Sequence, residues 1–268
     1  VYNNRDQCIN LFTWDKDGKR VMHTCSFEPY LYVEDNRGDK TSIYGTKVKK
    51  KKFNNRFNRS RFLSDSGIKR VFENAPPQQQ FLLDLYWQEN EKPEFNTQPL
   101  RVCLIDIETY SPDSFPDVDN PNHVVNVITC YDNFTKKFHT FGIKPYNGKG
   151  RPDLNYVHCR DERDMFIKFL EYLESDYPDI LSGWNSEFFD IPYIVGRIEH
   201  ILGQEYVNRL SPLGRVYSRL IRGQFGREQK RFYIEGVACL DYLDVYKRFC
   251  LKLRESYKLD AIGEVELG

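Results

Sequence analysis

The stretch Val102-Cys103-Leu104-Ile105-Asp106-Ile107-Glu108 (residues 102–108) decides the fold. Its first four residues form a short, continuous apolar run, which is typical of a central strand that is covered on both faces. Side chains alternate along a strand, so Asp106 and Glu108 share one face and lie about 7 Å apart along the chain. The stretch therefore predicts a buried strand that ends in two acidic residues on the same side.

Two carboxylates at the end of a buried strand are costly unless their charge is neutralised. Divalent cations are the usual solution, and hard carboxylate oxygens suit Mg²⁺ or Mn²⁺. Two such ions about 4 Å apart can activate a water and stabilise the leaving oxygen of a phosphodiester. The pattern Asp-x-Glu is nevertheless common at strand ends, where it is usually solvated. Asp106 and Glu108 alone therefore do not decide for a metal site.

The residues that follow alternate between strand and helix patterns. Strand patterns occur at residues 124–131, 137–143 and 179–182, and helical spacing of apolar residues occurs at 161–175 and 190–202. Asp161 is a candidate cap for the first helix, and Pro192 is tolerated in the first turn of the second. This order predicts an α/β domain, within a chain that is α+β overall, with a mixed central sheet and flanking helices.

Residues 1–98 are expected to form a smaller, β-rich N-terminal domain. Residues 9–14 and 20–25 flank a turn of hairpin type, and residues 27–33 favour a further strand. The boundary is placed at the Pro/Glu/Asn/Gln-rich stretch Glu89 to Pro99, which leaves residues 99–268 for the α/β domain. The first part has 17 Lys and Arg against 13 Asp and Glu, and the second has 22 against 26. The chain is neutral overall, but residues 1–98 are basic and residues 99–268 are acidic.

Lys40 to Ser64 contains no acidic residue, and its lysines and arginines alternate with Phe53, Phe57 and Phe62. Cations release counterions from phosphates and aromatic rings offer stacking faces, so this run is a candidate nucleic-acid surface. A solvated face or a flexible loop is an alternative interpretation. No apolar run reaches the roughly 20 residues of a membrane span, and the seven scattered cysteines contain no CxxC pair. We therefore expect a soluble, intracellular protein without a disulfide framework, a cysteine zinc site or a membrane partner.

A third carboxylate stands in Ser182-Gly183-Trp184-Asn185-Ser186-Glu187-Phe188-Phe189-Asp190, between a short strand and a helix. Asp is also a favoured N-cap, so taken alone Asp190 favours a capping role. Asp-Ile-Glu followed by Trp-Asn-x-x-x-Phe-Asp, however, resembles exonuclease motifs I and II of the family B DNA polymerases, with surroundings similar to those of T-even-type bacteriophages. Further similar stretches follow the same order at residues 115–117, 126–132, 162–165, 211–216 and 240–247.

The resemblance implies a ribonuclease H-like 3′→5′ exonuclease domain that proofreads for a DNA polymerase with two Mg²⁺ or Mn²⁺ ions. Asp106 and Glu108 would ligate the metals, and Asp190 would support the second metal. Asn185 would hydrogen-bond the DNA strand that is digested. Phe115 is similar in placement to an aromatic residue that stacks on the frayed 3′ base, although a role in the core is an equal alternative.

Residues 216–232 are similar to a protruding β-hairpin of the family that helps to separate primer from template. Its cations Arg219, Arg222, Arg227, Lys230 and Arg231 fit either a phosphate-facing loop or an ordinary exposed basic loop. Asp241 and Asp244 lie in an amphipathic helical pattern, and we expect both to face water as structural residues.

The family's third motif, a Tyr and an Asp a few residues apart, is absent, as are the polymerase motifs. The chain is therefore expected to be a fragment, either truncated or from a split polymerase, that binds metal weakly and hydrolyses DNA poorly. The resemblance implies the single-stranded 3′ end of primer DNA as partner, other replication proteins through the full polymerase, and the cytoplasm of an infected bacterium as location. A non-catalytic module that binds nucleic acid, with RNA at the N-terminal domain, is the alternative.

Overall fold

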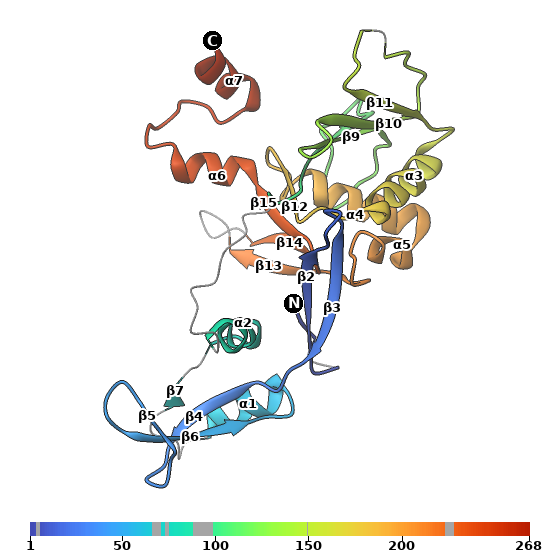
Figure 1. Ribbon diagram of the computed structural model, residues 1–268. Coiled ribbons are helices and arrows are strands. Elements are labelled where there is room, and N and C mark those ends of the chain that lie inside the picture. The colour runs from blue at the N-terminus through green and yellow to red at the C-terminus, as the bar shows by residue number, and fades with distance from the viewer. Residues whose placement is uncertain (4–5, 66–70, 73–74, 88–98, 149, 223–227) are drawn as a thin grey trace. The chain divides into compact units, whose positions relative to one another are not determined.

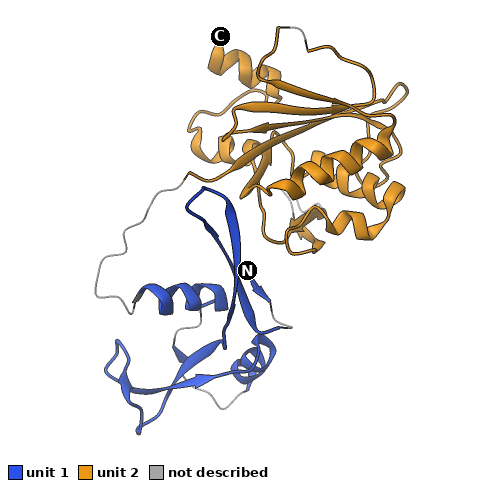
Figure 2. Ribbon diagram, turned by 45° about the vertical axis from the view of Figure 1, so that its right-hand side comes forward, with its two compact units in different colours: residues 1–97 blue, residues 98–268 orange. Residues whose placement is uncertain are grey.

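The computed structural model describes residues 1–3, 6–65, 71–72, 75–87, 99–148, 150–222 and 228–268. The chain divides into two compact units, Val1–Thr97 and Gln98–Gly268, which are blue and orange in Figure 2. Each unit contains its own cluster of buried apolar side chains. Within the described ranges, no helix is both long enough and apolar enough to cross a membrane.

The first unit contains two small antiparallel sheets and two helices. One sheet has the order β1 (Tyr2–Asn3), β2 (Cys8–Trp14), β3 (Arg20–Ser26). The other has the order β5 (Lys40–Thr41), β6 (Lys47–Lys52), β4 (Tyr30–Glu34), β7 (Val71–Phe72). The helices are α1 (Arg56–Ser64) and α2 (Pro77–Trp87). The predicted hairpin is confirmed, because β2 and β3 pair across its turn, and the strand predicted at residues 27–33 is β4.

The basic run at residues 40–64 folds mainly into β6 and α1, so its interpretation as a flexible loop is wrong. Val48 is buried in β6. The Nζ atom of Lys50 lies 3.5 Å from the ring centroid of Tyr30, and that of Lys51 lies 3.9 Å from the ring centroid of Phe62. Aromatic faces attract such cations electrostatically, which holds part of the lysine row on the surface of the unit.

The second unit is built on a mixed sheet of six strands (Figure 1). Its order is β11 (Leu154–His158), β10 (Lys137–Gly142), β9 (Val125–Asp132), β8 (Val102–Thr109), β12 (Ile180–Gly183), β15 (Ala238–Asp241). The central strand β8 pairs antiparallel with β9 and parallel with β12. The predicted mixed sheet is confirmed, whereas β11 and β15 are additions that the sequence patterns did not predict.

Helices α3 (Glu162–Ser175) and α4 (Asp190–Leu202) lie against one face of this sheet (Figure 1). Phe166, Phe169 and Ile198 from the two helices are fully buried and belong to the same core cluster as Ile105 of β8. The predicted cap is confirmed, because the side chain of Asp161 accepts a hydrogen bond from the backbone N–H of Asp164. The unit also contains α5 (Gln204–Asn208), α6 (Tyr242–Phe249) and α7 (Leu259–Leu267).

Strand β8 is covered on one face only, so the prediction of a strand buried on both faces is wrong. Cys103, Ile105 and Ile107 are buried beneath the helices. The alternate residues Leu104, Asp106 and Glu108 are exposed, and Leu104 retains 42% of its accessible surface. An apolar run of four residues does not distinguish the two cases, because either face of a strand can carry such side chains.

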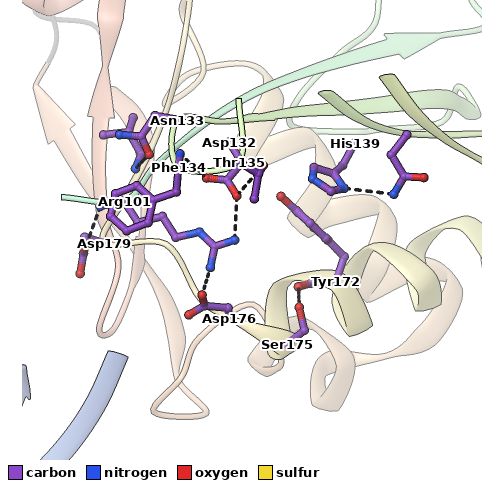
Figure 3. A network of polar contacts seen from close by, with 12 residues as sticks. Arg101, Asp132, Asn133, Phe134, Thr135, His139, Tyr172, Ser175, Asp176 and Asp179 are labelled. Carbon is purple, nitrogen blue, oxygen red and sulfur yellow. Dashed lines mark hydrogen bonds and ion pairs between the residues drawn. The ribbon is translucent and has the colours of Figure 1, made fainter. Parts of the chain in front are cut away.

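A network centred on Arg101 fixes the start of β8, at the end of the strand away from Glu108 (Figure 3). Its guanidinium donates to the buried carboxylate of Asp132 at 2.9 Å and pairs with Asp176, while its backbone N–H donates to Asp179 at 2.8 Å. Burial alone would raise the pKa of Asp132. Hydrogen bonds from the Phe134 backbone and from Arg101 outweigh it and hold the pKa below its ordinary value.

Candidate metal and nucleic-acid site

Asp106 and Glu108 stand on the open face of β8, close to the end of the strand. They pair across the sheet with Thr129 and Val127 of β9, and a register shift follows at Glu108 and Thr109. Although Asp106 is exposed, the surrounding protein removes part of its hydration and raises its pKa, and the neighbouring Glu108 raises it further. The two carboxylates therefore repel each other, and a cation bound between them would reduce this repulsion.

Asp190 joins the start of α4 to this strand. Its side chain is 3% exposed, and Oδ1 accepts a hydrogen bond of 3.0 Å from the backbone N–H of Ile107, the residue between Asp106 and Glu108. Burial, and then the charge of Asp106, raise the pKa of Asp190 to about 7. The N-cap position belongs to Phe189, so the interpretation of Asp190 as an N-cap is wrong.

The loop between β12 and α4 is organised by Asp241. Its carboxylate accepts hydrogen bonds from the backbone N–H groups of Asn185 at 3.0 Å, Glu187 at 3.1 Å and Leu243 at 2.9 Å. Asp241 is 3% exposed and caps α6, which corrects the expectation that it faces water, while Asp244 is exposed as expected. Asn185 is exposed and left-handed (φ 62°), a conformation that Asn tolerates better than most residues.

A close approach between β12 and β8 brings this loop to the carboxylates. A Cβ atom on Gly183 would lie 2.4 Å from the carbonyl oxygen of Ile105, so the close approach requires glycine. The loop that begins at Gly183 is thereby held next to the strand of Asp106.

Phe115 lies on the surface of the same unit. It is 84% exposed, which makes the alternative of a core role wrong, and its ring centroid lies 5.8 Å from that of Phe189. Phe189 in turn stacks on Tyr193 of α4, with centroids 5.8 Å apart. An open aromatic face thus stands next to the first residue of α4, Asp190.

Two side chains of α4 hold the segment between Phe115 and β9. Tyr193 Oη donates to the backbone oxygen of His123 at 2.9 Å and accepts from its N–H at 3.0 Å. Arg197 donates to the backbone oxygen of Pro121 at 3.0 Å and forms a buried ion pair with Glu162 of α3. Glu162 also accepts from the backbone N–H of Val125 at 2.8 Å. The segment between Phe115 and β9 is therefore fixed to the helix that begins at Asp190.

A two-stranded hairpin consists of β13 (Val216–Arg222) and β14 (Glu228–Ile234). Arg219, Arg222 and Lys230 are exposed on it, whereas Arg227 lies outside the described residues. The Arg219 guanidinium lies 5.4 Å from the ring centroid of Tyr217 and 5.5 Å from that of Tyr233, and the two rings stack 5.3 Å apart. These cations are placed where phosphates could reach them.

Arg231, the cross-strand partner of Arg219, is half-buried and forms an ion pair, in contrast to the exposed hairpin cations. Its Nη2 lies 2.6 Å from Oε1 of Glu187, which is 2% exposed in the loop after β12. Burial raises the pKa of Glu187, and Arg231 opposes that effect. The residues Glu187 and Asp241 were missed as parts of the site, because their partners lie 44 and up to 56 residues away in the sequence.

The donor set of Asp106, Glu108 and Asp190 fits Mg²⁺ or Mn²⁺ in chemistry, since all three are hard oxygen ligands. The pKa of Asp190 is raised partly by the charge of Asp106, and a cation bound nearby would reduce the repulsion between the two carboxylates. Within the described residues, however, no three His, Cys, Asp or Glu side chains converge into a ready metal-binding group. The side chains would need to adjust around an ion.

Comparison with known proteins gives a family and several viral relatives. The profile of the family described as "DNA polymerase family B, exonuclease domain" matches residues 53–262. The DNA-directed DNA polymerase of Escherichia phage RB69 is 29% identical over 95% of this chain and 31% of its own length. That of Enterobacteria phage T4 is 32% identical over 62% of this chain and 21% of its own length. A DNA polymerase of Paramecium bursaria Chlorella virus NY2A is 26% identical over 63% of this chain and 20% of its own length.

Proposed function

Because this chain belongs to the family B DNA polymerases and contains their exonuclease domain, we propose that it takes part in metal-dependent 3′→5′ hydrolysis of DNA. Its mixed sheet with flanking helices is the ribonuclease H-like fold of that domain. The chain spans about a third or less of the length of its phage relatives, so the activity of a whole polymerase is part of the proposal. The proposed product is a nucleoside monophosphate released from the 3′ end.

One observation carries the proposal: the buried Asp190 hydrogen-bonds the strand between Asp106 and Glu108, and Asp106 raises its pKa. Asp190 of α4 thus reaches the strand end that carries Asp106 and Glu108, which supports the proposal. Exonuclease domains of this family generally use divalent metals. Mg²⁺ or Mn²⁺, when bound, would supply an activated water and stabilise the leaving oxygen of the phosphodiester.

The residues of the chain would act as follows. Asp106, Glu108 and Asp190 would hold the metals. Asn185, which is exposed in the loop between β12 and α4, would hydrogen-bond the strand that is digested. Phe115 would stack its open face on the terminal base, because aromatic stacking holds single-stranded DNA without regard to sequence. The exposed cations Arg219, Arg222 and Lys230 would contact phosphates of the separated strands.

The test is an Mn²⁺ titration of the chain and of its Asp106→Asn variant, by calorimetry or by the electron paramagnetic resonance of free Mn²⁺. We expect the substitution to weaken binding by about tenfold or more, since it removes an anionic ligand. Metal binding is the primary measurement because it depends on the carboxylates alone. Trimming of a labelled single-stranded oligonucleotide from its 3′ end is the second. Equal Mn²⁺ affinities in the two proteins would contradict the proposal and favour a non-catalytic binding module.

A second function, RNA binding by the first unit, is favoured by strand β6. Its lysines 47, 49, 51 and 52 are exposed, and Phe57 of α1 is 78% exposed. We expect a Lys47→Gln, Lys49→Gln double variant to weaken binding of a single-stranded RNA and to reduce its salt slope by about one. A Lys136→Gln, Lys137→Gln variant in the second unit is the control. An unchanged salt slope in the Lys47→Gln, Lys49→Gln variant would show that β6 does not bind the RNA.

The relatives, which include phage polymerases, support a proposal about where this activity takes place. We propose that the protein is viral and acts in the cytoplasm of an infected bacterium. Its DNA partner would be the single-stranded 3′ end of a primer, and other replication proteins would be reached through the full polymerase.

A further inference from the structure

The ion pair between Arg231 and Glu187 connects the hairpin to the loop of the proposed exonuclease site. The Nη2 atom of Arg231 lies 2.6 Å from Oε1 and 2.5 Å from Oε2 of Glu187. The side chain of Glu187 is 2% exposed, whereas that of Arg231 is 34% exposed. The pair therefore joins a buried carboxylate in the loop to a cation in the middle of strand β14 of the hairpin.

The loop end of this connection is rigidly placed. The backbone N–H of Glu187 donates to Oδ2 of Asp241, and the N–H of Asn185 donates to Oδ1 of the same carboxylate. The bond from Asn185 is 3.0 Å long and that from Glu187 is 3.1 Å long, both within the ordinary range for N–H···O hydrogen bonds. The position of Glu187 is thus coupled to that of Asn185, which the proposed function places against DNA.

The hairpin end is placed by the strand register. Arg231 pairs across the hairpin with Arg219, and Tyr233 pairs with Tyr217. Because paired residues in adjacent strands point to the same face, holding Arg231 against Glu187 sets the orientation of the face that carries Arg219. A second ion pair, between Arg215 and Glu235 at the base of the hairpin, is more exposed and connects only the two residues that flank its strands.

We propose that Glu187 and Arg231 are positioning residues that hold the hairpin in register with the loop of Asn185 and Asp190. This inference rests on the proposed function. A substrate that engages both elements, a duplex with an unpaired 3′ end, needs this register, because its separated strands must meet the hairpin and the loop together. A single-stranded oligonucleotide needs only the loop.

The experiment measures binding of two labelled DNAs by fluorescence anisotropy, with Ca²⁺ in place of Mg²⁺ to limit hydrolysis. One DNA is a duplex with mismatched 3′-terminal bases, and the other is the same primer strand alone. The variants are Glu187→Gln, which keeps the shape of the side chain, Arg231→Gln, and the exchanged pair Glu187→Arg with Arg231→Glu. Glu235→Gln is the matched control on the hairpin, and thermal melting checks that each variant is folded.

We expect Glu187→Gln and Arg231→Gln each to weaken binding of the mismatched duplex by about fivefold or more, with less than about a twofold change for the single strand. The exchanged pair should recover most of the lost affinity, and Glu235→Gln should resemble the wild type. If Arg231 instead contacts phosphate directly, Glu187→Gln will free it and leave binding unchanged or tighter. That result overturns the inference, as does an equal loss for both DNAs.

Failure of the inference can be told apart from failure of the proposed function. If the proposed function is wrong, the wild-type chain will show no Mn²⁺ binding that depends on Asp106. If only the inference is wrong, that binding will be present, and the Glu187 and Arg231 variants will bind the two DNAs as the wild type does.

Discussion

Asp190 is a carboxylic acid held out of water beside a second carboxylate, and both conditions favour its protonated form. Its hydrogen bond from the Ile107 backbone opposes them but does not prevail, so the pKa rises to about 7. A side chain placed in this way adds little to the stability of the neutral-pH protein. Its location is understood more readily as part of a site that receives positive charge.

Because burial and Asp106 raise the pKa of Asp190, we predict that the stability of the protein depends on pH when a chelator keeps metals away. The folded-state pKa of about 7 lies above the ordinary value of 3.8, so the stability that this group contributes is present below about pH 4 and is lost as the pH rises through about 7. Asp190→Asn removes the titration and keeps an oxygen for the Ile107 N–H. Between pH 4 and pH 8 the variant should gain about 3 kcal/mol over the wild type, measured by urea unfolding. Parallel pH profiles for the two proteins would contradict this explanation.

Phe115 offers a second prediction for a single side chain. Because its ring is 84% exposed, Phe115→Ala should change the free energy of unfolding by less than about 1 kcal/mol. It should weaken binding of a single-stranded 3′ end by about 1–3 kcal/mol, through the loss of stacking. Phe134→Ala, at an exposed turn of the same unit, is the control. Retention of full DNA affinity in Phe115→Ala would exclude stacking on this ring.

Helix α4 combines two tasks: it begins at Asp190, and through Arg197 it holds the segment between Phe115 and β9. Arg197→Ala would leave Glu162 buried without its partner, so we expect a loss of about 3–5 kcal/mol in the free energy of unfolding. Arg209→Ala breaks the more exposed pair with Glu174 and should cost about 1 kcal/mol or less. Chemical denaturation of both variants checks the contrast, and equal losses would contradict it.

The long, periodic elements were predictable from the sequence, whereas the short and non-local features were not. The amphipathic spacing and the cap at Asp161 identified α3 and α4. Strand β15, of four residues, carries no period of its own and is defined only by pairing with β12. The exposed face of β8 could not be predicted from its sequence either, because the number of covered faces depends on which other elements pack against the strand.

The candidate site shows the same division. Asp106, Glu108 and Asp190 could be selected because their spacing resembles motifs of a known family. Glu187 stands within one of these motifs without a signal of its own. Its role depends on Arg231, and no local pattern predicts a contact between residues 44 positions apart.

At the scale of the whole molecule, the two units have separate buried clusters, one around Ile9 and Tyr30 and one around Ile105 and Phe166. A compact unit with its own core can fold by itself. Residues 98–268, produced alone, should therefore melt within a few degrees of the corresponding transition in the full chain and keep their affinity for Mn²⁺. Calorimetry of the two proteins tests this expectation, and loss of a cooperative transition in the shorter chain would contradict it.

The open face of β8 also bears on solubility. In the sheet register Leu104 and Leu240 stand on either side of Ser182, and they are 42% and 45% exposed. Exposed apolar strips favour self-association, and nearby like charges on Asp106 and Glu108 oppose it by keeping two such faces apart. A variant that neutralises Asp106 should therefore weaken the electrostatic repulsion that opposes self-association through this face.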